Sequence, residues 1–198
     1  MDAAHLDDQL LNQIRDGDVA ALGAIYDKYR LMVYHTALAI TRDQPAAEEI
    51  LKQCFLHVHT HADQLDGEQP IAPWLYRVTV DLSRARLTHR AGWWAPVENV
   101  LDRFDRLIAP RRPALDAPLR PRDIWAGLPD AIESLPFNQR IVLILYYLGG
   151  LSLKEIAFVI DRPLGTVKSR LHYGRELLRA RLAGAPPAAT LEVAHDPA

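Results

Sequence analysis

Apolar residues between positions 135 and 182 have the spacing of short helices. Leu135-Pro136 precedes a long apolar run, from Ile141 to Tyr147, and proline suits the first turn of a helix. The run predicts a buried helix that ends at Gly149-Gly150. No segment of the chain shows the alternation of apolar and polar residues that is typical of a strand.

Two further helices are predicted after that break. Ser152 and Glu155 have the spacing of a capping box, in which each side chain hydrogen-bonds a free backbone amide of the new helix. The second helix should stop at Asp161-Arg162-Pro163, because proline cannot donate a helical hydrogen bond. The third, containing residues 165–175, turns hydroxyl and basic side chains away from its core-facing residues Val167, Leu171 and Leu178. A tight turn followed by a basic helix is typical of a DNA-binding helix-turn-helix.

The first half is predicted to form three or four amphipathic helices. Gly17-Asp18 breaks the first apolar stripe, and the aspartate can cap the helix that follows. Asp43 begins another helix, with Glu48-Glu49 near its positive end. The last begins at Trp74, after turn residues at Asp66-Gly67, Pro70 and Pro73. It is expected to carry an outer basic edge formed by Arg77, Arg84, Arg86 and Arg90.

The predicted fold class is all-α, with two small helical domains joined by a proline-rich, partly helical linker. The expected divisions are a first domain at 1–90, a linker at 91–122 with a helix at about 97–109, a second domain at 123–184 and a disordered tail at 185–198. The linker helix follows from the apolar stripe Val97, Val100, Leu101, Phe104, Leu107 and Ile108.

Charge is distributed unevenly along the chain. The net charge is −2, but residues 1–65 hold 5 Lys and Arg against 10 Asp and Glu, whereas residues 136–184 hold 8 against 3. Residues 77–122 add 10 Arg against 5 acids. Positive potential is therefore expected on the middle and the end of the chain, where phosphate could be met, and an acidic surface at the start is left for protein contact.

Composition limits the remaining possibilities. Met1-Asp2 is not followed by a secretory leader, and no run of about 18 apolar residues predicts a membrane span, so we expect a cytoplasmic protein. The lone Cys54 agrees with a reducing compartment. Cys54, His57 and His61 share one helical face, but Cys54 lies on the apolar stripe and no fourth ligand is evident, so no metal and no cofactor are predicted. No nucleophile–base pair or phosphate loop suggests an enzyme.

Both halves, in this order, resemble a bacterial RNA polymerase sigma factor of the sigma-70 family, extracytoplasmic-function (ECF) type. The first half carries the resemblance through Gly17-Asp18, Ala47-Glu48-Glu49-Ile50-Leu51, Phe55-Leu56, Leu65-Asp66-Gly67 and Trp74-Leu75-Tyr76-Arg77. The second carries it through Leu135-Pro136, Gln139-Arg140, Gly150-Leu151-Ser152, Glu155-Ile156-Ala157, Pro163 and Gly165-Thr166-Val167-Lys168-Ser169-Arg170-Leu171. The resemblance implies a non-catalytic transcription initiation factor that binds core RNA polymerase and promoter DNA, and that an anti-sigma factor regulates.

The resemblance also implies roles for individual residues. Core polymerase binding falls to Glu49, Lys52, Gln53 and Leu56. Contact with the −10 element falls to Trp74, Arg77, Asp81, Arg84, Arg86 and Arg90, although the apolar stripe below Trp74 favours a place in the core. Recognition of the −35 major groove falls to Thr166, Lys168, Ser169, Arg170, His172, Tyr173 and Arg175.

Several positions depart from the family's pattern. Lys52-Gln53 replaces a pair such as Gln-Glu, Thr79-Val80-Asp81 replaces Ala-Arg-Asn, and Ala85 stands where an aspartate is expected. Asp161 stands where glycine is common in the turn, a change that aspartate tolerates in a left-handed conformation. Tyr173-Gly174 replaces Arg-Ala, and Gly174 is expected to loosen the recognition helix by up to about 1 kcal/mol relative to alanine.

Two other functional classes remain open. A LuxR-type regulator has a similar helix-turn-helix, but Leu65-Asp66-Gly67 and Trp74-Leu75-Tyr76-Arg77 argue against it. A divergent sigma-like interaction protein, which binds polymerase or an anti-sigma factor without full promoter melting, is the stronger alternative because of Asp81. The linker stripe either packs between the two domains, is covered by an anti-sigma partner, or extends the core of the first domain.

Overall fold

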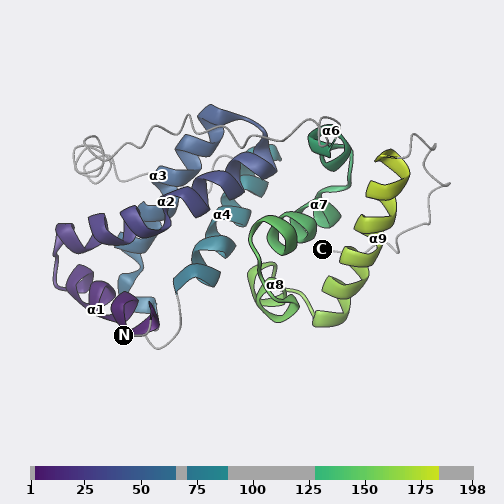
Figure 1. Cartoon of the computed structure of the whole chain (residues 1–198). Helices are drawn as coiled ribbons and strands as arrows, with labels where there is room; N and C mark the ends of the chain where they lie inside the picture. Colours follow the sequence, from purple (N-terminus) through teal and green to yellow (C-terminus); the bar gives the residue numbers. More distant parts are fainter. Residues whose placement is uncertain (1–2, 66–70, 89–127, 183–198) are drawn as a thin grey trace.

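The computed structural model describes residues 3–65, 71–88 and 128–182, and within these ranges every regular element is helical. The first half contains α1 (Ala3–Arg15), α2 (Val19–Thr41), α3 (Gln44–Thr60), the 3-10 turn η1 (Ala62–Gln64) and α4 (Ile71–Leu87). The second contains α6 (Leu128–Glu133), α7 (Phe137–Leu143), the π-helical turn η4 (Ile144–Leu148), α8 (Leu153–Val159) and α9 (Leu164–Leu182). The all-α prediction is confirmed, and Figure 1 shows α1–α4 on the left and α6–α9 on the right.

Three helix starts lie where the polar residues predict them. Asp18 accepts a hydrogen bond from the Ala20 amide at 2.8 Å and begins α2. Asp43 accepts one from the Ala46 amide at 3.3 Å and begins α3. Each side chain replaces a hydrogen bond that the first turn of a helix cannot make within itself.

The predicted start of α4 at Trp74 is wrong by three residues, since the helix begins at Ile71 and includes Pro73. Proline is acceptable there because the amides of the first helical turn have no intrahelical acceptor. Pro73 was therefore interpreted as a break when it lies inside the first turn.

The core of the first half lies between α1, α2, α3 and α4. Its centre includes Tyr26 and Phe55, whose rings meet edge to face with centroids 5.0 Å apart. A buried ion pair attaches α1 to this core: Asp7, which is 1% exposed, accepts hydrogen bonds from Lys28 Nζ and Tyr29 Oη, both at 2.6 Å. Burial, followed by the Asp7 carboxylate, raises the pKa of Tyr29 well above its usual value, so the phenol stays protonated as the donor.

The core of the second half is not confined to that half. It collects the apolar residues of α7, η4, α8 and α9, but Ile40 from α2 and Tyr76 and Val80 from α4 are buried in the same cluster. Two helical units are present, as predicted, and they are packed against one another through α4.

Several predictions concern residues outside the described ranges. These are the linker at 91–122 with its helix at about 97–109, the tail at 185–198, the turn at Asp66-Gly67 and Arg90. Among the residues that are described, no helix has both the length and the apolar character needed to cross a bilayer.

Candidate nucleic-acid interface

The helix-turn-helix is formed by α8 and α9, and its capping box is confirmed. The Glu155 carboxylate accepts from the Ser152 amide at 2.7 Å, while Ser152 Oγ accepts from the Glu155 amide at 3.3 Å. These hydrogen bonds hold the pKa of Glu155 below its usual value, because they favour the charged carboxylate.

The turn between α8 and α9 is a Schellman motif built on aspartate. The amide of Arg162 donates to the Ala157 carbonyl at 3.1 Å, and the amide of Asp161 donates to the Phe158 carbonyl at 3.3 Å. Asp161 has φ 50°, a left-handed conformation that glycine adopts with less strain. The tolerance predicted for aspartate at this position is confirmed, and the turn fixes the angle at which α9 leaves α8.

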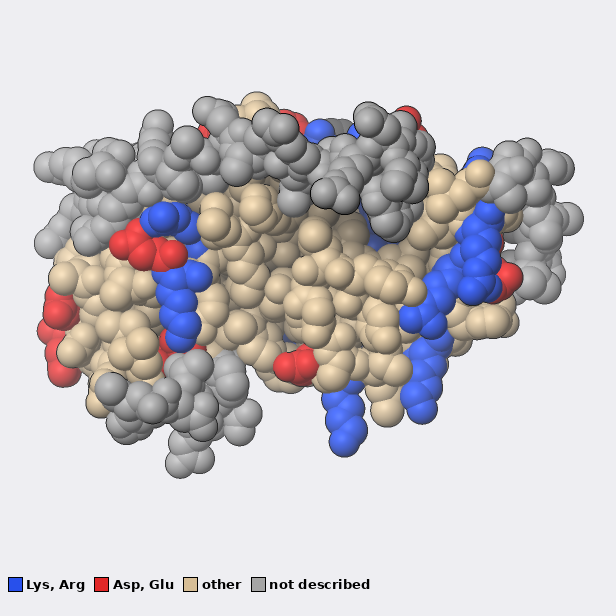
Figure 2. Space-filling model, in the orientation of Figure 1, with Lys and Arg blue, Asp and Glu red and all other residues tan. Residues whose placement is uncertain are grey.

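The seven residues predicted to meet the −35 element all lie on α9, around its buried stripe of Val167, Leu171 and Gly174. Lys168, Ser169, His172 and Tyr173 are exposed, and Thr166, Arg170 and Arg175 are partly exposed. Figure 2 shows Lys and Arg side chains following this helix along the right-hand side of the molecule. The helix therefore offers hydrogen-bond donors and positive charge together, as a major-groove reader requires.

Gly174 is a close-packing residue, which changes the interpretation of this departure. A Cβ added there would lie 3.1 Å from Leu143 Cδ1 and 3.4 Å from Gln139 Cβ, both on α7. The expectation that Gly174 only loosens α9 considered helix propensity alone. The structure adds that the missing side chain lets α9 approach α7 closely.

Arg175 is held by two tyrosines that the sequence placed in a buried helix. Its Nε donates to Tyr147 Oη at 2.8 Å, and its guanidinium carbon lies 5.2 Å from the Tyr146 ring centroid and 5.4 Å from that of Tyr147. Tyr147 is 62% exposed because the helix widens into the π-turn η4, so the prediction of a buried Tyr147 is wrong. A phenol at the end of an apolar run was the signal available in the sequence, since its hydroxyl needs a partner or water.

The basic edge predicted on α4 is not free. Arg77 Nη2 lies 3.8 Å from Asp161 Oδ2, and the Arg77 guanidinium carbon lies 5.7 Å from the Phe158 ring centroid. The guanidinium carbon of Arg84 lies 5.5 Å from the Phe137 ring centroid. Only Arg86 remains exposed among the described arginines of this edge.

The Thr79-Val80-Asp81 departure divides between the interior and the surface. Thr79 is fully buried and donates to the Leu75 carbonyl at 2.7 Å, and Val80 is fully buried in the second core. Only Asp81 is exposed. Partial desolvation by the surrounding protein raises its pKa, while Arg84 and Arg77 oppose that rise. Trp74 is partly buried and packs against the first core, as its apolar stripe favours.

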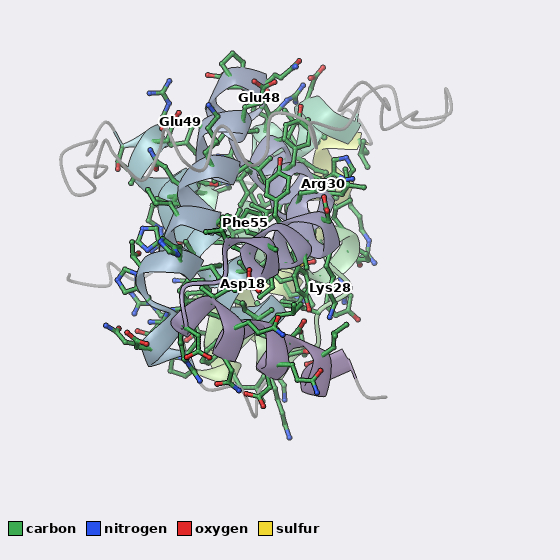
Figure 3. The ribbon with its side chains drawn as sticks, turned by 90° about the vertical axis from the view of Figure 1, so that its left-hand side faces the viewer. Asp18, Lys28, Arg30, Glu48, Glu49 and Phe55 are labelled. Atoms are coloured by element: carbon green, nitrogen blue, oxygen red, sulfur yellow. The ribbon has the colours of Figure 1, made fainter. Side chains whose placement is uncertain are left out.

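The face predicted to bind polymerase lies on α3. Glu48 and Glu49 lie on its exposed side, away from Phe55 in the interior (Figure 3). Gln53 Nε2 donates to Glu49 Oε1 at 2.7 Å, and Lys52 is partly exposed beside them. Leu56 is only 9% exposed, so it offers little surface to a partner.

The possible metal ligands do not form a site. Cys54 is fully buried, where its thiol approaches the Leu75 carbonyl and the Thr79 hydroxyl. The His57 and His61 rings stack at 5.1 Å, and burial together with His61 lowers the pKa of His57 to about 4. No group of three or more His, Cys, Asp or Glu in the described ranges could hold a metal ion.

Comparison with known proteins matches both halves. The model described as "Sigma-70 region 2" matches residues 25–92, and "Sigma-70, region 4" matches residues 126–178. The chain is 28% identical over 177 residues to "ECF RNA polymerase sigma factor SigW" of Bacillus subtilis, covering 87% of this chain and 94% of that relative. It is 27% identical over 188 residues to "ECF RNA polymerase sigma-E factor" of Haemophilus influenzae, covering 91% and 97%.

Two solved structures share the fold. "Structure of CnrH in complex with the cytosolic domain of CnrY" superposes with a TM-score of 0.64 at 18% identity, over 91% of this chain and 99% of the other. "Sigma factor RpoE in complex with the anti-sigma factor NepR from Bartonella quintana" gives 0.58 at 17% identity, over 78% and 92%. With both regions matched in order and the capped helix-turn-helix in place, the chain belongs to the sigma-70 family of RNA polymerase sigma factors, within its ECF type.

Proposed function

We propose that this chain is a transcription initiation factor that binds core RNA polymerase and directs it to promoters by reading −10 and −35 elements. The observation that carries the proposal is the capped helix-turn-helix with a basic, exposed α9 in region 4, joined to a complete region 2 in the same chain. Relatives named as ECF RNA polymerase sigma factors, matched over most of their length, support it.

In region 4, the exposed residues of α9 would enter the −35 major groove. A guanidinium such as that of Arg170 can read guanine through two hydrogen bonds, and such a pair contributes about 1–3 kcal/mol of discrimination. Lys168 and Ser169 are suited to phosphate, as are Thr166 and the nearby helix start. His172 and Tyr173 are exposed one turn further along, and Arg175 is oriented by Tyr147.

In region 2, α3 would dock on polymerase and α4 would meet the −10 strand. The docking face would use Glu49, Lys52 and Gln53, with a small contribution from Leu56. On α4 the surface would comprise Trp74, Arg77, Asp81, Arg84 and Arg86, continued by Arg90. A carboxylate at Asp81 can accept a hydrogen bond from a cytosine amine but repels phosphate, so the −10 preference should differ from that of an asparagine at this position.

An anti-sigma factor is the regulatory partner that we propose. Both structural neighbours are complexes, one with the cytosolic domain of CnrY and the other with the anti-sigma factor NepR. The proposed activity is non-enzymatic and requires no cofactor, and it would take place in the cytoplasm, where polymerase is found.

A second candidate is a sigma-like regulator that binds polymerase or an anti-sigma factor without melting promoters. The exposed carboxylate of Asp81 and the engagement of Arg77 and Arg84 by the other half favour it. Run-off transcription with purified core polymerase, on a promoter library randomised at both elements, separates the two. Transcripts from one pair of motifs support an initiation factor, whereas polymerase binding without transcripts supports the regulator.

A further inference from the structure

Region 4 covers the face of α4 that is assigned to the −10 strand. Tyr76 and Val80 of α4 are buried in the same apolar cluster as Leu145 and Ile156 of region 4. Tyr76 Oη also donates to the Gly149 carbonyl at 3.4 Å. In Figure 1, α4 lies in the middle of the molecule, next to α7 and α8.

The polar contacts across this boundary use the basic residues that DNA would use. Arg77 meets the Asp161 carboxylate and the Phe158 ring, and Arg84 lies over the Phe137 ring. An arginine that binds single-stranded DNA meets the same two chemistries, a phosphate oxygen and the flat face of a base. Region 4 thus presents α4 with a carboxylate and aromatic rings where the nucleic acid would present phosphate and bases.

Two departures from the family's pattern meet at this boundary. Val80 occupies a position where arginine is common, and its apolar side chain is fully buried in the shared cluster. Asp161 occupies a position where glycine is common, and it keeps a left-handed φ of 50° while approaching Arg77. A residue under backbone strain that also makes a contact across the boundary points to a role for that contact.

We propose that region 4 is an intramolecular partner of α4 and competes with the single-stranded −10 DNA for the same surface. This inference rests on the proposed function, because that function assigns α4 to the −10 element. In the closed form Arg77 and Arg84 are engaged, so the free chain binds −10 DNA poorly. In the open form region 4 leaves α4, and the arginines are released to phosphate and bases.

The closed form remains able to meet polymerase. Glu48 and Glu49 are exposed on α3, which lies on the other side of region 2 from α8, and Gln53 is bonded only within that face in the described contacts. Polymerase can therefore dock on α3 first, and −10 binding follows once α4 is released. The ion pairs Arg77–Asp161 and Arg42–Glu133 are solvent-exposed and individually weak, so the two forms can exchange.

The test uses the full chain with two variants on the region 4 side of the boundary. Phe158→Ala removes the exposed ring under Arg77, and Asp161→Gly removes the carboxylate while placing the preferred residue in the left-handed turn, so the helix-turn-helix stays folded. Glu176→Gln is the matched control, since it also removes one negative charge from region 4 but its ion pair is with Arg179 on the same helix.

Two measurements are made on each variant. Energy transfer between dyes on Gln13→Cys and Arg181→Cys reports opening, because both positions are exposed and the native Cys54 is buried. Binding to a fluorescein-labelled, randomised single-stranded DNA 20-mer reports access to α4 without polymerase. We expect Phe158→Ala and Asp161→Gly to lower the transfer efficiency and to tighten DNA binding by about three- to tenfold, because apparent affinity scales with the open fraction.

The outcomes separate this inference from the proposed function. Unchanged energy transfer in both variants, or tightening no greater than that of Glu176→Gln, overturns the closed form even if the wild-type chain transcribes with polymerase. Opening without any gain in DNA binding overturns the competition. Absence of transcription by every protein, together with opening and tighter DNA binding in the two variants, leaves the inference standing and removes the proposed function instead.

Discussion

Replacing Gly174 by alanine sets two effects of known size against each other. Alanine is favoured over glycine inside a helix by up to about 1 kcal/mol. The new Cβ, however, would lie 3.1 Å from Leu143 Cδ1 and 3.3 Å from Leu143 Cγ. Leu143 is itself buried and has little room to move, and overfilling a packed core costs about 1–3 kcal/mol. We therefore expect a net loss in the free energy of unfolding of about 1 kcal/mol, and a shift of α9 relative to α7.

Gly165→Ala is the matched control on the same helix. A Cβ at Gly165 meets nothing within 4 Å, so this variant should gain up to about 1 kcal/mol from helix propensity alone. The assay is urea unfolding of both variants followed by circular dichroism, together with the affinity of the Gly174→Ala variant for a −35 duplex. Equal stabilisation by the two substitutions would refute the argument that α9 needs glycine for its approach to α7.

Three further predictions follow from the described contacts. Asp7→Asn should cost about 1–3 kcal/mol, because it leaves Lys28 without its carboxylate, whereas Asp8→Asn at the surface should be nearly neutral in the same urea titration. The pKa of His57 falls from 6.5 in an unfolded chain to about 4 when folded, so the unfolded chain binds more protons in this window. Stability should therefore fall as pH drops from 6.5 toward 4, and more steeply in the wild-type chain than in His57→Gln; equal slopes would contradict this. Tyr147→Phe should weaken binding to a −35 duplex about fivefold, since it removes the hydrogen bond that orients Arg175, and an unchanged affinity would show that the bond is dispensable.

Local chemistry was enough to predict where helices begin. Asp18, Asp43 and Ser152 each cap a helix through atoms two or three residues away, so the sequence contains both partners of every contact. The all-α class and the helix-turn-helix follow from the same short-range patterns, and so does the exposure of most of α9.

Contacts between distant segments could not be predicted in this way. Arg77 and Asp161 are 84 positions apart in the sequence and the pairing depends on how the two halves pack, which no local pattern specifies. Gly174 was misread for the same reason, because its neighbour Leu143 belongs to another helix. Tyr147 was misplaced because a π-turn rotates the end of an apolar run toward solvent, and its spacing alone is that of an ordinary helix.

The burial of Cys54 has a consequence for how this protein can receive signals. It is the only cysteine in 198 residues, it is inaccessible to solvent, and burial raises the pKa of its thiol to about 12. Oxidants and electrophiles react with accessible thiolates, so this thiol is chemically silent while region 2 stays folded. If oxidative stress activates transcription through this chain, the sensing thiol or metal must belong to another molecule, and this chain can respond only by being released.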